Sequence, residues 1–253
     1  MIEVLRRRRA KATLFEVMLV GEDDEHLEAV GEAALDEVVR VEQMLSRYDP
    51  VSELSRLNRL ANESVLVTVE LHQLLVRCRK YRRSTHGLFD PTLTGSEIIF
   101  DGPEVCLHGA CLDLGGIGKG YALDRVVTII RSFGIEHFLL HGGTSSVFAV
   151  GQRADGTPWS VSLRGCQEQI ILENQALSCS GAGEDLIEPQ SQEPLAGTQS
   201  VAVIAPLAEL AEVWSTAALV AGLDHARSLR YPDGSSVAWI EAGSLIWLTG
   251  EPR

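Results

Sequence analysis

The spacing of apolar residues divides the chain into a first half of long helices and a second half of short strands. Helical periodicity extends over residues 23–46, 70–84 and 117–133. Each of these segments is therefore predicted to be a helix that buries one face against a core. A fourth helix is predicted near the end of the chain, over residues 207–222.

Strand-like segments occupy most of the remaining chain. They are short apolar or alternating runs between turn residues, and they cover residues 12–20, 64–69, 105–112, 137–141, 145–150, 159–164, 169–173, 176–180, 200–205, 236–241 and 244–248. Ser52 can cap a short helix through Leu54 and Leu57, and a polar stretch at 182–199 interrupts the strands. Because the strands are grouped, the pattern favours an α+β fold with antiparallel or mixed sheets over a doubly wound parallel sheet.

The composition is that of a globular protein with one large domain or two closely packed ones. The chain has 253 residues, of which 45% are apolar and 23% charged, enough to bury a large core. We interpret residues 1–253 as a single domain. No apolar run reaches the roughly 18 to 20 residues that cross a bilayer, and the basic N-terminal segment lacks the apolar run of a cleaved leader. We therefore expect a cytoplasmic protein without a membrane anchor.

Charge and cysteine content argue against two classes of function. A formal net charge of −13 disfavours nucleic-acid binding, which needs a basic face. The basic clusters at 6–9 and 77–83 are interpreted as solvated surface, the first at a terminus that need not be ordered. Five scattered cysteines without a CxxC pair argue against a disulfide framework and a cysteine zinc site.

The segment DLGGIGKGYALDR, residues 113–125, is the most informative motif of the chain. Lys119 stands among four glycines at the predicted start of a helix: Gly115, Gly116, Gly118 and Gly120. Glycines allow positive φ angles and close approach to a ligand, a helix start favours an anion, and the lysine adds positive charge. These features favour a diphosphate or nucleotide site. The alternative is a tight turn, although a turn requires fewer glycines, and neither common phosphate-loop consensus is present.

Six segments, taken in order, resemble the ApbE family of FAD:protein FMN transferases. They are LSRYDPVSELSRLN at 45–58, HGLFDPT at 86–92, DLGGIGKGYALDR at 113–125, HGGTSSVFAVG at 141–151, DGTPWSVSLR at 155–164 and SVAVIAPLAELAEVWSTAALVAG at 200–222. Any one of them is weak by itself. Six in the right order, over nearly the whole chain, make a chance resemblance improbable.

This resemblance implies a two-lobed α+β fold that binds FAD and Mg²⁺ in a cleft between the lobes. Family members cleave the pyrophosphate of FAD and transfer FMN to a Thr or Ser hydroxyl of a target protein, and some hydrolyse FAD to FMN and AMP. The implied ligands and partners are a flavin nucleotide, Mg²⁺ and a target protein. Lys119 would take a catalytic role by neutralising charge on the phosphates.

The resemblance also assigns a metal site. The backbone carbonyl of Gly118 matches a family metal ligand, and Glu212 and Thr216 match the family's metal-binding Asp and Thr. Glu212 and Thr216 lie four residues apart on a predicted helix, so their oxygens project from one face, and Mg²⁺ prefers oxygen ligands. Without the resemblance, a helical Glu is usually a surface residue, and Thr216 would be read as packing.

The flavin-binding residues are assigned in the same way. Tyr48 offers a flat face on which an isoalloxazine ring can stack, and Asp113 would orient the glycine segment or a ribityl hydroxyl. The other implied contacts are Glu53, Asp90, Thr92, Gly115, Gly116, Lys119, Gly142, Gly143, Ser180 and Gly181. Taken singly, a tyrosine beside a turn, an Asp-Pro turn and a Ser-Gly turn are more often structural.

Two features depart from the family pattern. Asp185 stands where the family has a histidine that is important for activity, and a carboxyl group lacks the proton donor of an imidazole near neutral pH unless its pKa is strongly raised. Residues 93–112 are also shorter than the family's insertion, which helps to enclose the ligand. Asp185 is thus a candidate catalytic residue, and three hypotheses stay open: an enzyme, a degenerate FAD- or nucleotide-binding homologue without transfer activity, and a purely structural protein.

Overall fold

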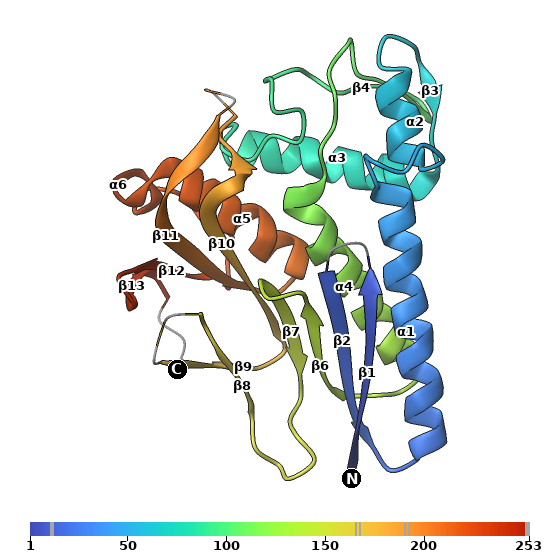
Figure 1. The fold of residues 1–253 in the computed structure, drawn as a ribbon, viewed down its shortest axis with the longest axis vertical. Helices are drawn as coiled ribbons and strands as arrows, with labels where there is room; N and C mark the ends of the chain where they lie inside the picture. The colour runs from blue at the N-terminus through green and yellow to red at the C-terminus, as the bar shows by residue number, and fades with distance from the viewer. Residues whose placement is uncertain (11–12, 165, 167, 190, 192, 251–253) are drawn as a thin grey trace.

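The computed structural model describes residues 1–10, 13–164, 166, 168–189, 191 and 193–250, and only the backbone of Glu184 and Asp185. Within these residues the largest element is an eight-stranded sheet in the order β1-β2-β6-β7-β10-β11-β12-β13 (Figure 1). Every neighbouring pair is antiparallel. Its strands are β1 (Ile2–Ala10), β2 (Thr13–Gly21), β6 (His137–Gly142), β7 (Ser146–Val150), β10 (Gln175–Ile187), β11 (Pro194–Ala205), β12 (Ser236–Glu241) and β13 (Ser244–Thr249).

Helices cover one face of this sheet and a hairpin covers part of the other. The helices α1 (Asp24–Leu45), α4 (Gly115–Ser132) and α5 (Ala208–Ala221) lie on β1–β2, β6–β7 and β10–β11 respectively. On the other face, the hairpin β8 (Trp159–Ser162) and β9 (Gln169–Leu172) buries Trp159 to 1% exposure. The predicted α+β fold is confirmed, and α1, α4 and α5 each bury an apolar stripe against this sheet.

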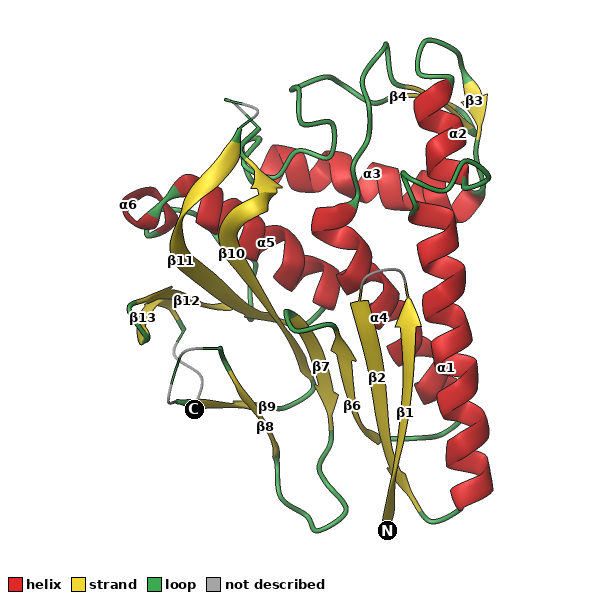
Figure 2. Cartoon of the chain, viewed as in Figure 1, coloured by secondary structure: helices red, strands yellow, loops and turns green. Residues whose placement is uncertain are grey.

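The residues between α1 and α4 form a smaller lobe, at the top of Figure 2. It contains α2 (Glu53–Arg59), α3 (Val69–Ser84) and a small sheet of β3 (Val65–Leu66), β5 (Glu104–Cys106) and β4 (Ile99–Asp101). Ser52 caps α2 as predicted, accepting a hydrogen bond from the Ser55 amide at 2.9 Å. After α5 the chain forms the short α6 (Leu223–Ala226). None of the helices that the structure describes is long and apolar enough to cross a membrane.

The first strand corrects the prediction for residues 6–9. These arginines are not a loose solvated terminus, because the whole of β1 pairs with β2. Arg6 and Arg8 form ion pairs with acidic residues of α1, and Arg7 pairs with Glu16 of β2. The acidic partners lie on other elements, so the basic run by itself could not indicate them.

The glycines of the 113–125 motif also differ from the prediction. Helix α4 begins at residue 115 rather than 117, so the four glycines lie inside the helix, and none of them has a positive φ. A special backbone conformation is therefore not the reason for these glycines. Close approach requires a glycine at Gly120, whereas Gly118 has ordinary space around it.

Two more predictions were wrong in part. The strand predicted over 105–112 ends at Cys106, and the polar stretch at 182–199 extends β10 and β11 into a hairpin.

Helices α4 and α5 cross so closely at Gly120 that a side chain has no room. A methyl group on Gly120 would lie 2.4 Å from the carbonyl oxygen of Ala208. We expect Gly120→Ala to lower the free energy of unfolding by about 1 to 3 kcal/mol, because the helices must separate. Gly118→Ala in the same helix is the matched control, since its methyl group meets Leu45 at an ordinary 3.7 Å. Urea denaturation of both variants tests this, and equal stabilities would contradict it.

Asp124 of α4 accepts hydrogen bonds from the amides of Ala208 and Glu209 at the start of α5, at 2.8 and 2.9 Å. Burial raises the pKa of its carboxyl to about 7. The unfolded chain loses this proton near pH 4, so between about pH 4 and 7 only the folded state holds it. The contribution of Asp124 to stability therefore falls as the pH rises through this range, by on the order of 4 kcal/mol in total.

We expect this dependence to disappear in Asp124→Asn. Urea denaturation between pH 5 and 7.5 should show that the free energy of unfolding of the wild type declines relative to that of the variant. Two parallel profiles would show that Asp124 does not titrate in this range.

Candidate functional site

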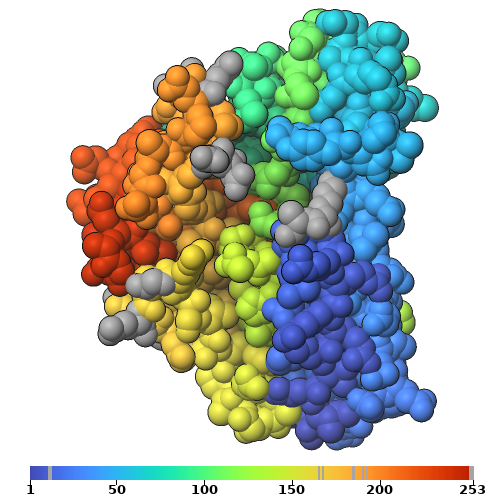
Figure 3. Space-filling view, in the orientation of Figure 1, coloured from blue at the N-terminus to red at the C-terminus, as the bar shows by residue number. Residues whose placement is uncertain are grey.

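A cavity of about 420 Å³ lies between the two lobes. Figure 3 shows the molecular surface hollowed between the β10–β11 hairpin, in orange, and the small lobe, in cyan and green. The walls come from the loop at 88–93, the start of α4, β10 from Ser178 onward and one face of α5. The predicted cleft between two lobes is thus present, and segments from both halves of the sequence line it.

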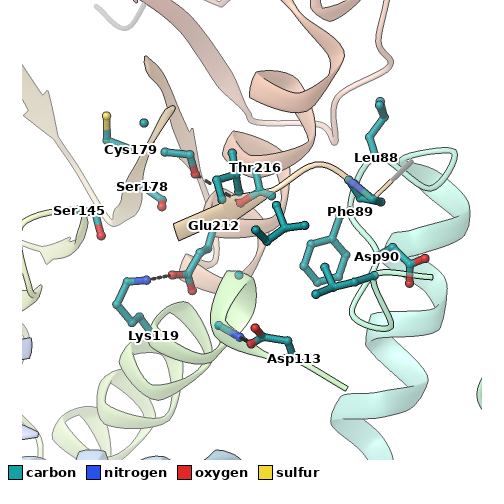
Figure 4. Close-up of a pocket in the computed structure, with 18 residues that line it drawn as sticks. Leu88, Phe89, Asp90, Asp113, Lys119, Ser145, Ser178, Cys179, Glu212 and Thr216 are labelled. Carbon is teal, nitrogen blue, oxygen red and sulfur yellow. Dashed lines mark hydrogen bonds and ion pairs between the residues drawn. The ribbon is translucent and has the colours of Figure 1, made fainter. Parts of the chain in front are cut away.

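Lys119 and Glu212 form an ion pair in this cavity (Figure 4). The Lys119 Nζ lies 2.5 Å from Oε1 of Glu212, and Oε2 accepts a hydrogen bond from the Gly120 amide at 2.6 Å. The Glu212 side chain is 4% exposed and that of Lys119 33%. The neighbouring carboxylate raises the pKa of Lys119, which keeps the ammonium charged at neutral pH. The sequence suggested a lysine free to hold a diphosphate, whereas the structure pairs it with the predicted metal ligand.

Hydroxyl groups line the cavity beside Glu212. The Ser180 Oγ lies 2.8 Å from Ser215 Oγ and 3.3 Å from Thr216 Oγ1. Ser215 also donates to the carbonyl oxygen of Glu212 at 3.0 Å. The predicted residues Ser180, Gly181 and Thr216 therefore converge on one wall, where hydroxyls can donate hydrogen bonds to phosphate oxygens.

Asp113 separates this cavity from a second one of about 280 Å³, and it lines both. Its Oδ1 accepts a hydrogen bond from the Gly115 amide at 2.8 Å, and its Oδ2 lies 2.6 Å from Nη1 of Arg47. Arg47 also lies over the ring of Tyr48, 4.8 Å from the ring centroid. Tyr48 is 75% exposed at the edge of the second cavity. The structure thus brings Tyr48, Asp113, Gly115 and Lys119 together, as predicted.

Asp90 folds the loop that carries Phe89 into the large cavity. It accepts hydrogen bonds from the amides of Thr92 and Gly95, each at 2.9 Å, and from the Thr92 hydroxyl at 2.8 Å. Arg82 pairs with the same carboxylate at 3.3 Å. The prediction that the basic cluster on α3 is only solvated surface is therefore wrong, since Arg82 balances a buried carboxylate.

Four implied flavin contacts lie outside both cavities. The Thr92 hydroxyl donates a hydrogen bond to Asp90 and so stabilises the loop, on the side of a separate small cavity. Glu53 accepts hydrogen bonds from the amide and hydroxyl of Thr68, at 2.5 and 2.7 Å, and so joins α2 to α3. Gly142 and Gly143 pack against side chains of the large sheet and of α4. These residues support the cavity walls without lining them. Their presence in the motifs can therefore be explained without a ligand contact.

Glu212 and Thr216 fit part of a site for a hard divalent cation. They lie one turn apart on α5 and both line the large cavity. Gly118 lines the second cavity instead, so the structure does not bring the third implied donor to the same hollow. Among the described residues, no three His, Cys, Asp or Glu side chains form a metal-binding group. A carboxylate and a hydroxyl nevertheless suit Mg²⁺, which keeps most of its positions for water and substrate phosphate.

Asp185 stays a prediction. Its backbone belongs to β10, and its side chain lies outside the described part of the structure. The residues that follow it, Leu186, Ile187 and Pro189, line the large cavity. This part of the chain therefore forms a wall of the site.

Sequence reasoning missed several residues of the site. Phe89 stands inside the HGLFDPT motif and Arg47 precedes Tyr48, so both could have been found from their neighbours. Ser178 and Ser215 gave no such signal, because a serine in a strand or among helical alanines reads as packing. Both are buried in the hydroxyl cluster, where the Ser215 Oγ lies 3.4 Å from that of Ser178.

Known proteins are similar to this chain in sequence and in fold. The ApbE family model matches residues 12–97 and 96–237. The FAD:protein FMN transferase of Escherichia coli K12 is 27% identical over 148 residues, covering 51% of this chain and 42% of that protein. That of Klebsiella pneumoniae is 28% identical over 164 residues, covering 56% and 47%. The matches thus span less than half of the length of these curated relatives.

Solved structures share the fold over nearly the whole chain. The ApbE protein of Thermotoga maritima has a TM-score of 0.86 and 24% identity, with 97% of both chains covered. The flavinyl transferase ApbE of Pseudomonas stutzeri also has a TM-score of 0.86, with 20% identity and coverage of 97% and 95%. Because the family model extends over most of the sequence, this chain belongs to the ApbE family.

Proposed function

We propose that the protein is a Mg²⁺-dependent FAD:protein FMN transferase, which cleaves the pyrophosphate of FAD and transfers FMN to a Thr or Ser of a target protein. The observation that carries this proposal is the Lys119–Glu212 pair in the large cavity. It places a cation and a carboxylate side by side, next to a helix start and a cluster of hydroxyls. The curated relatives, which are FAD:protein FMN transferases, support the same activity.

The charges around the cavity suit a diphosphate that arrives with a divalent cation. Among the described residues, three carboxylates line the cavity, and each has a cationic partner: Asp90 with Arg82, Asp113 with Arg47, and Glu212 with Lys119. The described part of the site is therefore close to neutral before a ligand enters. A pyrophosphate adds about two negative charges, which Mg²⁺ balances while it stabilises charge on the reacting phosphate oxygens.

Glu212 and Thr216 would hold the ion, and the Gly118 carbonyl is the third ligand that the family implies. With a cation at Glu212, Lys119 would be free to contact the phosphate oxygens. The pair thus separates into two binding groups of opposite sign, each of which meets the charge that it favours. The backbone of Gly115 and Gly116 and the hydroxyl of Ser180 would contact the same phosphates.

The second cavity would hold the flavin ring. Its apolar side is formed by Phe15, Val41 and Leu45, and its open edge by Tyr48. An aromatic ring system gains from stacking on such a face. Asp113 lines both cavities and so stands where the ribityl chain would connect the ring to the diphosphate.

The transfer step replaces the phosphoanhydride bond of FAD with a phosphoester bond to the target protein. The acceptor hydroxyl attacks the phosphorus of the FMN half, a new oxygen–phosphorus bond forms, and the bond to the AMP oxygen breaks. The hydroxyl proton must be taken up, and the AMP phosphate carries the electron pair away. We assign proton uptake to Asp185 as part of this proposal, since a carboxylate can accept a proton although it cannot donate one at neutral pH.

Incubation with FAD, Mg²⁺ and a peptide that carries an acceptor threonine tests the function. We expect AMP and a flavinylated peptide, both of which chelation of Mg²⁺ should abolish. Bound FAD without AMP would instead support the hypothesis of a binding protein without transfer activity. Asp185 and the short 93–112 segment favour that hypothesis. Absence of flavin binding would overturn the proposal.

Two parts of the proposal need tests of their own. Asp185→His restores the residue type of the family, and a higher rate of AMP release would show that this position limits the reaction.

The cytoplasmic location and the identity of the target protein are predictions, which cell fractionation and a search for flavinylated proteins would check.

A further inference from the structure

Helices α4 and α5 run antiparallel where they cross. One turn of α4 is joined to one turn of α5 by hydrogen bonds at both of its ends. Gly120 of α4 contacts Glu212 of α5, and Asp124, four residues later, contacts Ala208, four residues before Glu212. Four residues are about one helical turn, so both contacts fall on the facing sides of the two helices.

At each end of this unit a carboxylate of one helix binds the backbone of the other. Glu212 accepts a hydrogen bond from the Gly120 amide at 2.6 Å, and Asp124 accepts two from the amides of Ala208 and Glu209. The N-cap residue of α5, Leu207, provides no side-chain cap. Asp124 therefore supplies from another helix the cap that α5 lacks.

Glu209 attaches the same turn of α5 to α3. Its carboxylate lies 3.0 Å from Nε of Arg77 and accepts a hydrogen bond from the Tyr81 hydroxyl at 2.6 Å. That contact is made through a flexible side chain. Asp124 binds main-chain amides instead, so it fixes the position of α5 along its own axis and thereby the place of Glu212, one turn further on.

We propose that Asp124 is a positioning residue, which by capping α5 holds the Glu212 carboxylate against Gly120 and Lys119. Asp124 lines neither of the two cavities, so it acts through Glu212 and not on the substrate. The importance of this position for catalysis rests on the proposed function, whereas the placement of Glu212 can be measured without it.

Asp23 offers a matched control for this inference. It caps α1 by accepting a hydrogen bond from the His26 amide at 3.1 Å, and it lines neither cavity. Asp124→Ala and Asp23→Ala therefore remove the same side chain from two helix caps. If Asp124 is only a helix cap, both substitutions lower the free energy of unfolding and neither changes the surroundings of Glu212.

Hydrogen exchange of the Gly120 amide reports the position of Glu212 directly. We expect Asp124→Ala to accelerate exchange of this amide at least tenfold relative to core amides of the large sheet. We also expect it to weaken Mn²⁺ binding at least tenfold, as measured by electron paramagnetic resonance without flavin. Asp23→Ala is expected to change either value less than twofold. Asp124→Asn keeps one acceptor oxygen and is expected to recover most of the protection.

Equal exchange of the Gly120 amide in Asp124→Ala and Asp23→Ala, with equal Mn²⁺ affinity, would reduce Asp124 to an ordinary cap and overturn the inference. If Asp124→Ala does not fold, Asp124→Leu, which keeps the shape of the side chain without an acceptor oxygen, is compared with Asp23→Leu, and an unchanged Gly120 exchange rate has the same meaning. If the wild type releases no AMP, the proposed function fails, yet the exchange measurement still decides whether Asp124 places Glu212.

Discussion

Replacing Lys119 by methionine is expected to lower the rate of AMP release from FAD by about 10²- to 10³-fold. Lys119 is the only cation among the described residues that line the large cavity. Its loss removes the group that neutralises phosphate charge, and a methionine keeps much of the side-chain volume. It also leaves the carboxylate of Glu212, 4% exposed, without its cationic partner, so we expect lower stability as well.

Two further variants separate charge from structure in this experiment. Lys119→Arg keeps the positive charge and should retain much more activity than the methionine variant. Lys80→Met makes the same substitution at an exposed position of α3 and should leave the rate unchanged. AMP release by chromatography and FAD affinity by flavin fluorescence are the readouts. If Lys119→Met retains wild-type rate and affinity, Lys119 does not contact the phosphates.

Glu212→Gln is expected to reduce the affinity for Mg²⁺ by at least about 10²-fold and the rate of AMP release at limiting Mg²⁺ by a similar factor. The amide keeps an acceptor oxygen for the Gly120 N–H group but loses the negative charge that attracts a hard cation. Removal of one member of an enclosed charge pair is also costly, because Lys119 then lacks its counterion. Titration with Mn²⁺ in the presence of FAD measures the affinity.

The double variant Lys119→Met with Glu212→Gln tests whether the two side chains act as a pair. We expect it to be more stable than Lys119→Met alone, because no buried carboxylate is left without a partner. Glu241→Gln changes an exposed carboxylate of β12 and should affect neither metal affinity nor stability by a measurable amount. Strictly additive effects in the double variant would show that the ion pair makes no contribution.

Most of the fold followed from local pattern. The helices at 23–46, 70–84 and 207–222 were predicted to within about two residues, because an apolar stripe of helical period has only one way to be buried. Strand β1 was missed because four consecutive arginines hide the alternation of a strand, and their ion pairs with acidic residues of α1 and β2 are not visible in a local window. The β10–β11 extension was missed because a hairpin that projects beyond the core need not be apolar.

The site was predicted as a set of residues but not as an arrangement. Asp90, Asp113, Lys119, Ser180 and Glu212 do line a cavity, as their motifs implied. Thr92 and Glu53 belong to the same motifs yet support the loops and helices around it. A motif contains both residues that line the cavity and residues that support its walls. Only the three-dimensional structure distinguishes the two kinds.

The sequence by itself determined the order of the elements, the family and the residue types of the site, because each of these depends on spacing along one segment. The tertiary structure alone decided that Lys119 pairs with Glu212, that Gly120 of the motif lets α4 and α5 cross closely, and that Asp124 caps α5. The first of these contacts joins residues 93 positions apart. Their geometry arises only when two helices pack on one sheet, and no local pattern in either helix contains that information.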